Sequence, residues 1–194
     1  MEIPQSKIVR GFTSSIGGPP YYQINRTYPN EAGQMPTGAL FYGGEVFDRY
    51  SRGLELTASD IQQIVADQIA SFALPQDPIG IYVVLASADV SSNATGFCIP
   101  SAHPHHGTGS VLGAEFKYAF VGNPMRCPSL AAPQFMANGA LLPSPNGSVP
   151  ADAMASMLAN LWTSVVTTHL VENGLTDTDW KTQLSVKANS ERPI

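Results

Sequence analysis

Three of the four histidines in this chain lie within residues 102–110, which read AHPHHGTGS. Imidazole nitrogens are common ligands of zinc and other divalent first-row ions, so His103, His105 and His106 invite comparison with a metal site. Pro104 and the glycines that follow favour a loop, which is a poor frame for fixed ligand geometry. No nearby acid or thiol is left to complete a coordination set if Cys98 forms a disulfide. The stretch alone therefore predicts a loop without a bound metal.

The only two cysteines, Cys98 and Cys127, allow two different interpretations. They could form one disulfide in an oxidising compartment, or remain two buried thiols in a reducing one, and the residues alone leave both open. A nucleophilic pair of Cys98 with His105 would need a free thiol. A disulfide would remove that option.

Other catalytic motifs are missing from the sequence. It has no G-x-S-x-G nucleophile motif and no P-loop, and the last glycine of GTGSVLG (107–113) comes one position too late for a dinucleotide fingerprint. Asp89 follows a predicted strand and could serve as a functional acid at a strand end. A role in capping its own loop is the favoured interpretation. We therefore predict no catalytic residue and no cofactor.

The composition argues against two classes of binding partner, nucleic acid and membrane. Charged residues make up 13% of the chain, and the formal net charge is −5 without a basic cluster, which argues against binding nucleic acid or anionic membrane. Low charge, 16 Pro, 17 Gly and three glycosylation sequons lean toward secretion. The sequons start at Asn25, Asn93 and Asn146. The first ten residues lack the apolar core of a signal peptide, and no apolar run is long enough to span a membrane.

Hydrophobic periodicity predicts the elements that must position these residues. Helices are expected in PQSKIVRGFTSSIGG, in LTASDIQQIVADQIASF with Thr57 as N-cap, and in ADAMASMLANLWTSVVTTHL. GALFYGGEVF predicts one or two short strands, GIYVVLAS a central strand buried on both faces, and EFKYAFVG an alternating strand nearer an edge. Residues 123–150 read as a long irregular connection, and the chain from Val171 as a polar tail. The pattern predicts one α/β (α+β) domain with helices packed on a mixed sheet.

Several of these strings, in this order, resemble the phosphate-induced protein 1, or EXORDIUM-like, family. They are SKIVRGFTSSIGGPPYYQIN, LTASDIQQIVADQIA, GIYVVLASADV followed by GFC, KYAFVGNPMRCP, and SPNGSVPADAMASMLA. The resemblance implies an EXORDIUM-like domain over residues 1–169, three-layer-like and with a zincin-like arrangement left open, followed by a divergent tail at 170–194. It also implies that the family's signal peptide, N-terminal strand and C-terminal part are absent here, as in a fragment or an altered gene model.

The family pattern bears on the cysteines and histidines. Members usually carry a second cysteine four residues after each first one, at the positions of Ala102 and Ala131 here. Loss of both favours a remaining Cys98–Cys127 disulfide, whereas local bridges in the family would leave two unpaired thiols. Among the histidines, only His105 falls where members carry one. His105 is therefore the one weak metal candidate.

The resemblance also bears on catalysis. Some microbial relatives carry a His-Glu pair in the third helix, as in zinc peptidases, and here Asn160 and Leu161 replace the two residues. Neither replacement can supply the imidazole and carboxylate that such a site needs, and His169 reads as a helix C-terminal residue. We therefore expect a non-catalytic protein, with a metallopeptidase-like hydrolase or its inactive remnant as the alternative.

The resemblance further implies where such a protein works. The expected location is the extracellular space, apoplast or cell wall, and the expected role lies in growth or nutrient responses. The partner would be an unidentified extracellular polymer or protein, bound in part by the 123–150 connection with Phe135 and Met136.

Overall fold

A computed structural model describes the fold of most of the chain. The described residues are 5–27, 29, 33, 35, 38, 40–92, 97–98, 105–131, 136–137, 140–141, 143–172 and 181–188.

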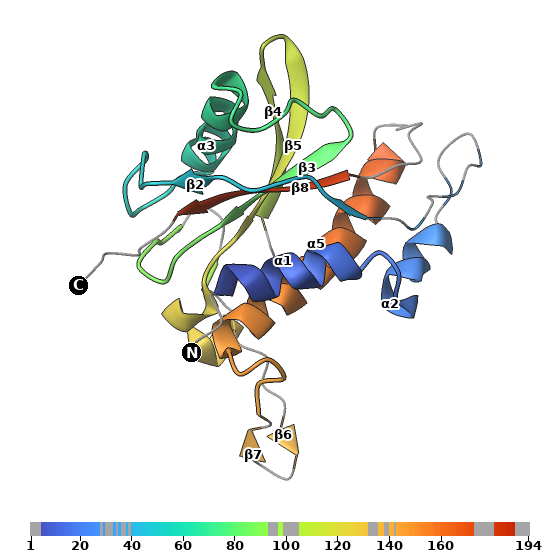
Figure 1. Cartoon of the computed structure of the whole chain (residues 1–194), viewed down its shortest axis with the longest axis vertical. Helices are drawn as coiled ribbons and strands as arrows, with labels where there is room; N and C mark the ends of the chain where they lie inside the picture. Colours follow the sequence, from blue (N-terminus) through green and yellow to red (C-terminus); the bar gives the residue numbers. More distant parts are fainter. Residues whose placement is uncertain are drawn as a thin grey trace.

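A six-stranded mixed sheet forms the centre of the molecule (Figure 1). The strands are β1 (Phe41–Tyr42), β2 (Phe47–Asp48), β3 (Gly80–Leu85), β4 (His105–Val111), β5 (Ala114–Val121) and β8 (Lys181–Ala188). Their order is β1-β8-β3-β5-β4, and β2 also pairs with β8. All pairings are parallel except that of β4 with β5, which form a hairpin.

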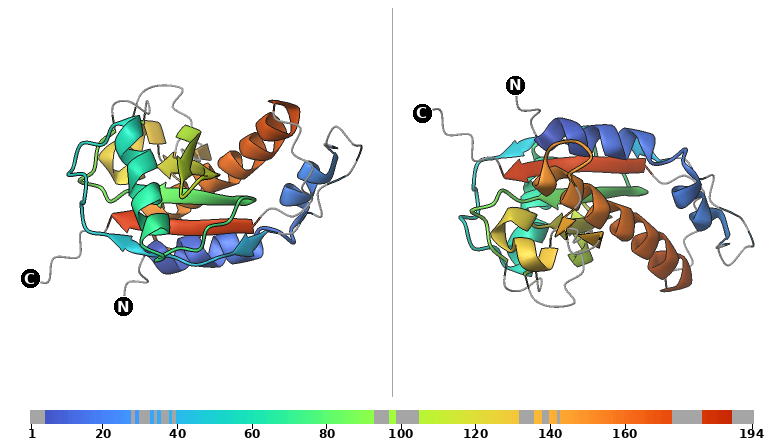
Figure 2. Two further views of the ribbon diagram at one scale, coloured as in Figure 1. Left: turned by 90° about the horizontal axis from the view of Figure 1, so that it is seen from above. Right: turned by 90° about the horizontal axis from the view of Figure 1, so that it is seen from below.

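Helices cover both faces of this sheet. One face carries α1 (Gln5–Ser15) and α5 (Val149–Glu172), and the other carries α3 (Ala58–Ala70). Figure 2 shows α3 in front of the sheet from above, and α1 and α5 in front of it from below. The short helices α2 (Pro20–Gln23) and η1 (Ile24–Thr27) follow α1. The prediction of a single three-layer α/β domain is confirmed.

Strand β3 joins the two hydrophobic cores because neighbouring side chains point to opposite faces. Ile81 and Val83 pack in the core beneath α1 and α5, whereas Tyr82 and Val84 pack in the core beneath α3. All six residues of β3 are buried. The prediction of a central strand buried on both faces is confirmed, as is the position of β5 nearer the edge.

The predicted helices also form, and local chemistry explains where α3 begins. The Thr57 hydroxyl accepts a hydrogen bond from the Asp60 backbone N–H, and the Asp60 carboxylate accepts one from the Thr57 N–H. This reciprocal capping box satisfies two amide groups that the helix cannot pair internally.

The histidine-rich stretch differs from the expected loop, because residues 105–111 form the edge strand β4. Its glycines lie opposite large aromatic residues of β5, with Gly107 paired to Tyr118 and Gly109 to Phe116. A Cβ added to Gly107 would lie 2.9 Å from the Tyr118 hydroxyl oxygen. The glycines therefore leave room for the neighbouring strand's rings, and they do not indicate a flexible loop.

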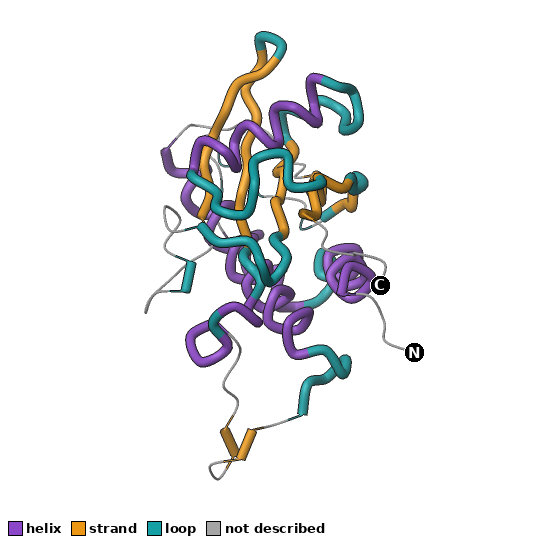
Figure 3. The backbone as a smooth tube through the Cα atoms, turned by 90° about the vertical axis from the view of Figure 1, so that its left-hand side faces the viewer, coloured by secondary structure: helices purple, strands orange, loops and turns teal. Residues whose placement is uncertain are grey.

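The 123–150 connection is also more structured than predicted. It contains η3 (Pro124–Arg126), α4 (Pro128–Ala131) and a hairpin of β6 (Met136–Ala137) and β7 (Ala140–Leu141). Figure 3 shows this hairpin at one end of the molecule, far from the turn between β4 and β5. Met136 lies in β6, and Phe135 falls outside the described residues.

The segment expected to be a polar tail contains β8, which lies inside the sheet between β3 and β1. An eight-residue strand with mixed polar and apolar residues gives a weak periodic signal, and its backbone pairing with β3 is what places it in the sheet. Within the part of the chain that the structure describes, no helix is long and apolar enough to cross a membrane.

Candidate functional site

The carboxyl ends of the parallel strands bring three loops to one edge of the sheet. The loops follow β2, β3 and β5 and supply Tyr50, Ser87, Asp89 and Arg126, which we call the carboxyl-edge cluster. In sheets with parallel strands, loops at this edge commonly carry ligand sites because helices cover both faces. The topology therefore favours a ligand site at this edge.

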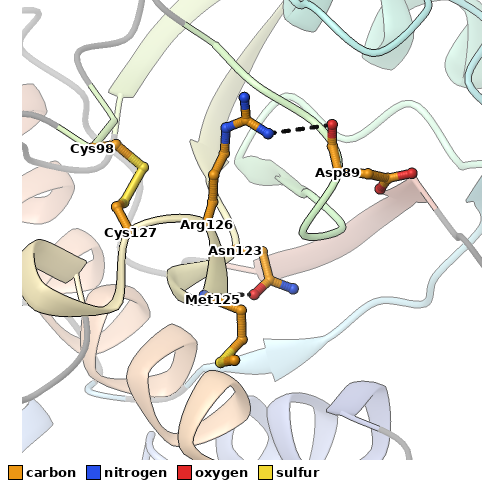
Figure 4. Close-up of a disulfide and its surroundings, with 6 residues drawn as sticks. All are labelled: Asp89, Cys98, Asn123, Met125, Arg126 and Cys127. Atoms are coloured by element: carbon orange, nitrogen blue, oxygen red, sulfur yellow. Dashed lines mark hydrogen bonds between the residues drawn. A yellow bond between two sulfur atoms is a disulfide. The ribbon is translucent and has the colours of Figure 1, made fainter.

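Asp89 connects the three loops through hydrogen bonds. The Tyr50 hydroxyl donates to Asp89 Oδ2 over 2.9 Å, and the Ser87 hydroxyl donates to Oδ1. Arg126 Nη1 donates to the backbone carbonyl oxygen of Asp89 over 3.4 Å, as Figure 4 shows. Asp89 thus does more than cap its own loop, because two of its partners come from other loops.

The surroundings of Asp89 favour its ionised form. Burial raises the pKa of this carboxyl group, but the hydrogen bonds from Ser87 and Tyr50, with the Arg126 charge, lower it by more. The net pKa lies below the ordinary value for aspartate. At neutral pH the cluster therefore presents the Asp89 carboxylate and, bonded to the backbone carbonyl of the same residue, the Arg126 guanidinium, and both residues are exposed.

Substituting Tyr50→Phe should weaken this arrangement in a pH-dependent way. The phenylalanine ring keeps the packing but cannot donate to Asp89, so the pKa of Asp89 should rise toward its ordinary value. We expect a stability loss of about 0.5–1 kcal/mol at neutral pH, at the low end for a charged hydrogen bond because Asp89 is exposed.

The sign of this effect follows from the lowered pKa. The stabilisation by Asp89 is complete above the ordinary aspartate pKa and is lost as pH falls through the folded-state value. Carboxyl NMR titration of Asp89 and urea unfolding at several pH values measure both quantities. A loss for Tyr50→Phe that persists at a pH where Asp89 is protonated would contradict this explanation.

A disulfide and a helix cap hold the Arg126 loop in place. Cys98 and Cys127 are bonded, with their Cα atoms 5.5 Å apart, so neither cysteine of the chain is free. Asn123, which is 5% exposed, caps η3 by accepting a hydrogen bond from the Met125 N–H over 3.0 Å (Figure 4). Arg126 thus lies between a buried cap and a covalent cross-link.

Two residues at this edge adopt backbone conformations that are uncommon for residues other than glycine. Tyr50 has a φ of 55° and Cys98 a φ of 72°. Such left-handed conformations persist where the surrounding structure enforces them, and they concentrate at functional sites. Contacts hold both residues in place here, because Tyr50 is hydrogen-bonded to Asp89 and Cys98 is bonded to Cys127, but Phe72 and Leu112 adopt such conformations away from this edge.

The histidines do not form a metal site in the described part of the chain. His105 begins β4, and its ring centroid lies 6.1 Å from that of Tyr118. Burial lowers the pKa of His105, which favours the neutral ring. Among the described residues, no group of three or more His, Cys, Asp or Glu side chains could hold a metal ion. His106 is the next residue of β4, and His103 falls outside the described residues.

Asn160 and Leu161, which the family resemblance aligned with a His-Glu pair, lie on different faces of α5. Leu161 is 1% exposed and packs in the core beneath α1 and α5, whereas Asn160 is exposed. His169 lies further along the same helix, and its side chain falls outside the description.

The two sequon asparagines that the structure describes lie in different surroundings. Asn25 lies in η1 and is 1% exposed, whereas Asn146 is exposed in the turn before α5. Asn93 falls outside the described residues.

Sequence reasoning singled out Asp89 but missed Tyr50, Ser87 and Arg126. Tyr50 lies 39 residues before Asp89, and Arg126 lies 37 residues after it, so no local motif connects them. The feature that could have found them is the parallel arrangement of the strands, because it brings the loops that follow parallel strands to one edge of the sheet.

Comparison with known proteins identifies the family. A family model described as the phosphate-induced protein 1 conserved region matches residues 11–188. This chain belongs to the phosphate-induced protein 1 family. The match extends to the last residue of β8, so it includes most of the segment that we expected to diverge from the family.

Curated members of the phosphate-induced protein 1 family from Arabidopsis thaliana are similar to this chain. Protein EXORDIUM-like 3 is 32% identical over 86% of this chain and 55% of its own length. Protein EXORDIUM-like 5 is 30% identical over 87% of this chain and 51% of its own length. The chain thus spans about half the length of these relatives. No solved structure matches it.

Proposed function

We propose that this member of the phosphate-induced protein 1 family is an extracellular protein that acts by binding, without catalysis. The carboxyl-edge cluster would be its contact surface, and the ligand would be a polysaccharide of the cell wall. A role in growth or nutrient responses agrees with the family's name. The observation that carries the proposal is the exposed pair of Arg126 and Asp89 on loops held by a disulfide.

The chemistry of the cluster suits a polysaccharide. Sugar hydroxyls both donate and accept hydrogen bonds, and the cluster offers a carboxylate acceptor, a guanidinium donor and two hydroxyl groups. A guanidinium also pairs with the carboxylate of an acidic sugar through two parallel hydrogen bonds. Because Asp89 is ionised and already accepts two hydrogen bonds, it suits a binding role better than that of a general acid.

A pull-down and titration with two defined polysaccharides tests this proposal. The probes are polygalacturonate, which is acidic, and xyloglucan, which is neutral, and the protein is the full chain with its disulfide intact. We expect binding to at least one probe, weakened about tenfold or more by Arg126→Ala, because arginine contacts often dominate binding energy. Arg126 is exposed, so this variant should keep its fold.

Lys7→Ala is the matched control. Lys7 is exposed on α1, so its substitution removes the same charge away from the cluster. It should leave the affinity unchanged, which separates a specific contact from general attraction. Equal affinities of Arg126→Ala and the unaltered chain, or no binding to either probe, would count against the proposal.

A further inference from the structure

The two sequons whose asparagines the structure describes lie in different structural surroundings. Asn25 lies in η1, and it is 1% exposed. The hydroxyl of Thr27, the third residue of this sequon, donates to the Ile24 carbonyl over 2.7 Å. A glycan on Asn25 could not be accommodated while this side chain is buried. A chain modified there would have to leave η1 unpacked from the core, and it would therefore be absent from the folded, secreted protein.

Asn146 presents the opposite situation. It is exposed in a turn closed by a hydrogen bond from the Gly147 N–H to the Ser144 carbonyl over 3.1 Å. Gly147 has a φ of 68°, a left-handed conformation that glycine adopts without strain. Ser148 completes the sequon directly before the first residue of α5.

Asp152 holds Asn146 in this position. Its carboxylate accepts hydrogen bonds from the Asn146 side-chain amide, the Asn146 backbone N–H and the Ser144 hydroxyl. Burial raises the pKa of Asp152, and these hydrogen bonds lower it by more, so the carboxylate is ionised at neutral pH. The turn is thus ordered, and its asparagine is nevertheless open to solvent.

From this contrast we infer that Asn146 carries an N-linked glycan and that Asn25 does not. The inference rests on the extracellular location in the proposed function, because glycan transfer occurs in the secretory pathway. The donor is an oligosaccharide linked to a lipid through pyrophosphate.

The transfer is compatible with the contacts of Asn146. Nδ2 bonds to the anomeric carbon of the sugar, and the bond from that carbon to the pyrophosphate breaks, with the lipid pyrophosphate leaving with the electron pair. One amide proton passes to a base of the transferase. The modified amide keeps one N–H, which is enough to donate to an oxygen of Asp152.

Mass spectrometry of the secreted protein tests this assignment. The full chain is fused to a cleavable secretion signal and expressed in a eukaryotic host, with Asn93→Gln present throughout so that two sequons remain. Peptide N-glycosidase converts each glycosylated asparagine to aspartate, and peptide mapping reads both positions. We expect conversion at Asn146 and none at Asn25.

Two substitutions at Ser148 provide matched controls. Ser148→Ala destroys the sequon but keeps Asn146 and its bonds to Asp152, so the glycan should be lost while the protein is still secreted. Ser148→Thr preserves the sequon and should keep the glycan. Conversion at Asn25 in secreted protein would overturn the inference, as would unmodified Asn146 in both the parent chain and Ser148→Thr.

The outcome of the mass spectrometry experiment is independent of the outcome of the polysaccharide binding test. Polysaccharide binding is measured on non-glycosylated protein from a bacterial host, so a failure to bind leaves the glycan assignment intact. Unmodified Asn146 would likewise leave the binding result unaffected.

Discussion

Replacing both cysteines, Cys98→Ser with Cys127→Ser, should lower the free energy of unfolding by about 3–4 kcal/mol. The disulfide joins residues 29 positions apart, so in the unfolded chain it restricts a loop that would otherwise sample many conformations. A loss of this size is a large part of the stability of a typical domain. Urea unfolding followed by tryptophan fluorescence measures it.

A reducing agent gives the internal control for this prediction. The unaltered chain in reductant should match the double serine variant, and the double variant should not respond to reductant. Equal stability of the oxidised chain and the double variant would contradict a stabilising role for the disulfide.

The same double serine variant can also be tested for polysaccharide binding at the carboxyl-edge cluster. Cys127 directly follows Arg126, and Cys98 lies on the loop that follows β3, as does Asp89. Removing the cross-link should therefore also weaken polysaccharide binding, even at a temperature where the double variant is still folded. The expected cause is lost preorganisation, because the residues of the carboxyl-edge cluster are unchanged.

The second large effect is expected for Gly109→Ala in β4, which should destabilise the protein by about 1–3 kcal/mol. A Cβ at this position would lie 2.5 Å from Phe116 Cζ and 2.9 Å from Gln62 Cγ. Phe116 is 2% exposed and packs edge-on against Tyr82, with ring centroids 6.0 Å apart, so it has little space to move. The expected loss of stability therefore comes from steric overlap in a packed core.

Gly11→Ala is the matched control for Gly109→Ala. Gly11 is exposed on α1, and a Cβ there would have no neighbour within 4 Å. Alanine restricts the unfolded chain and favours the helix, so this variant should be more stable by about 0.5–1 kcal/mol. If Gly109→Ala is as stable as the parent chain, the explanation of β4 by its aromatic neighbours is wrong.

The helices and the central strand could be predicted from the sequence because their signals are local. Thr57 and Asp60 place the start of α3 within four residues, and the unbroken apolar run of β3 demands burial on both faces. One or two short strands were predicted around Gly43 and Gly44, and the structure has two, β1 and β2. In each case, neighbouring residues carry the whole signal.

The sequence by itself determined the α/β domain with helices packed on a mixed sheet, which depends on local periodicity, and the family, which depends on ordered strings of residues. Only the tertiary structure decided that the glycine-rich histidine stretch is a strand, because its glycines are explained by Phe116 and Tyr118 of β5. It also decided that Asn25 is buried and Asn146 exposed, and which residues of other loops bond to Asp89. Burial and contacts between distant loops depend on how the strands are arranged in the sheet, and no short stretch of sequence contains that arrangement.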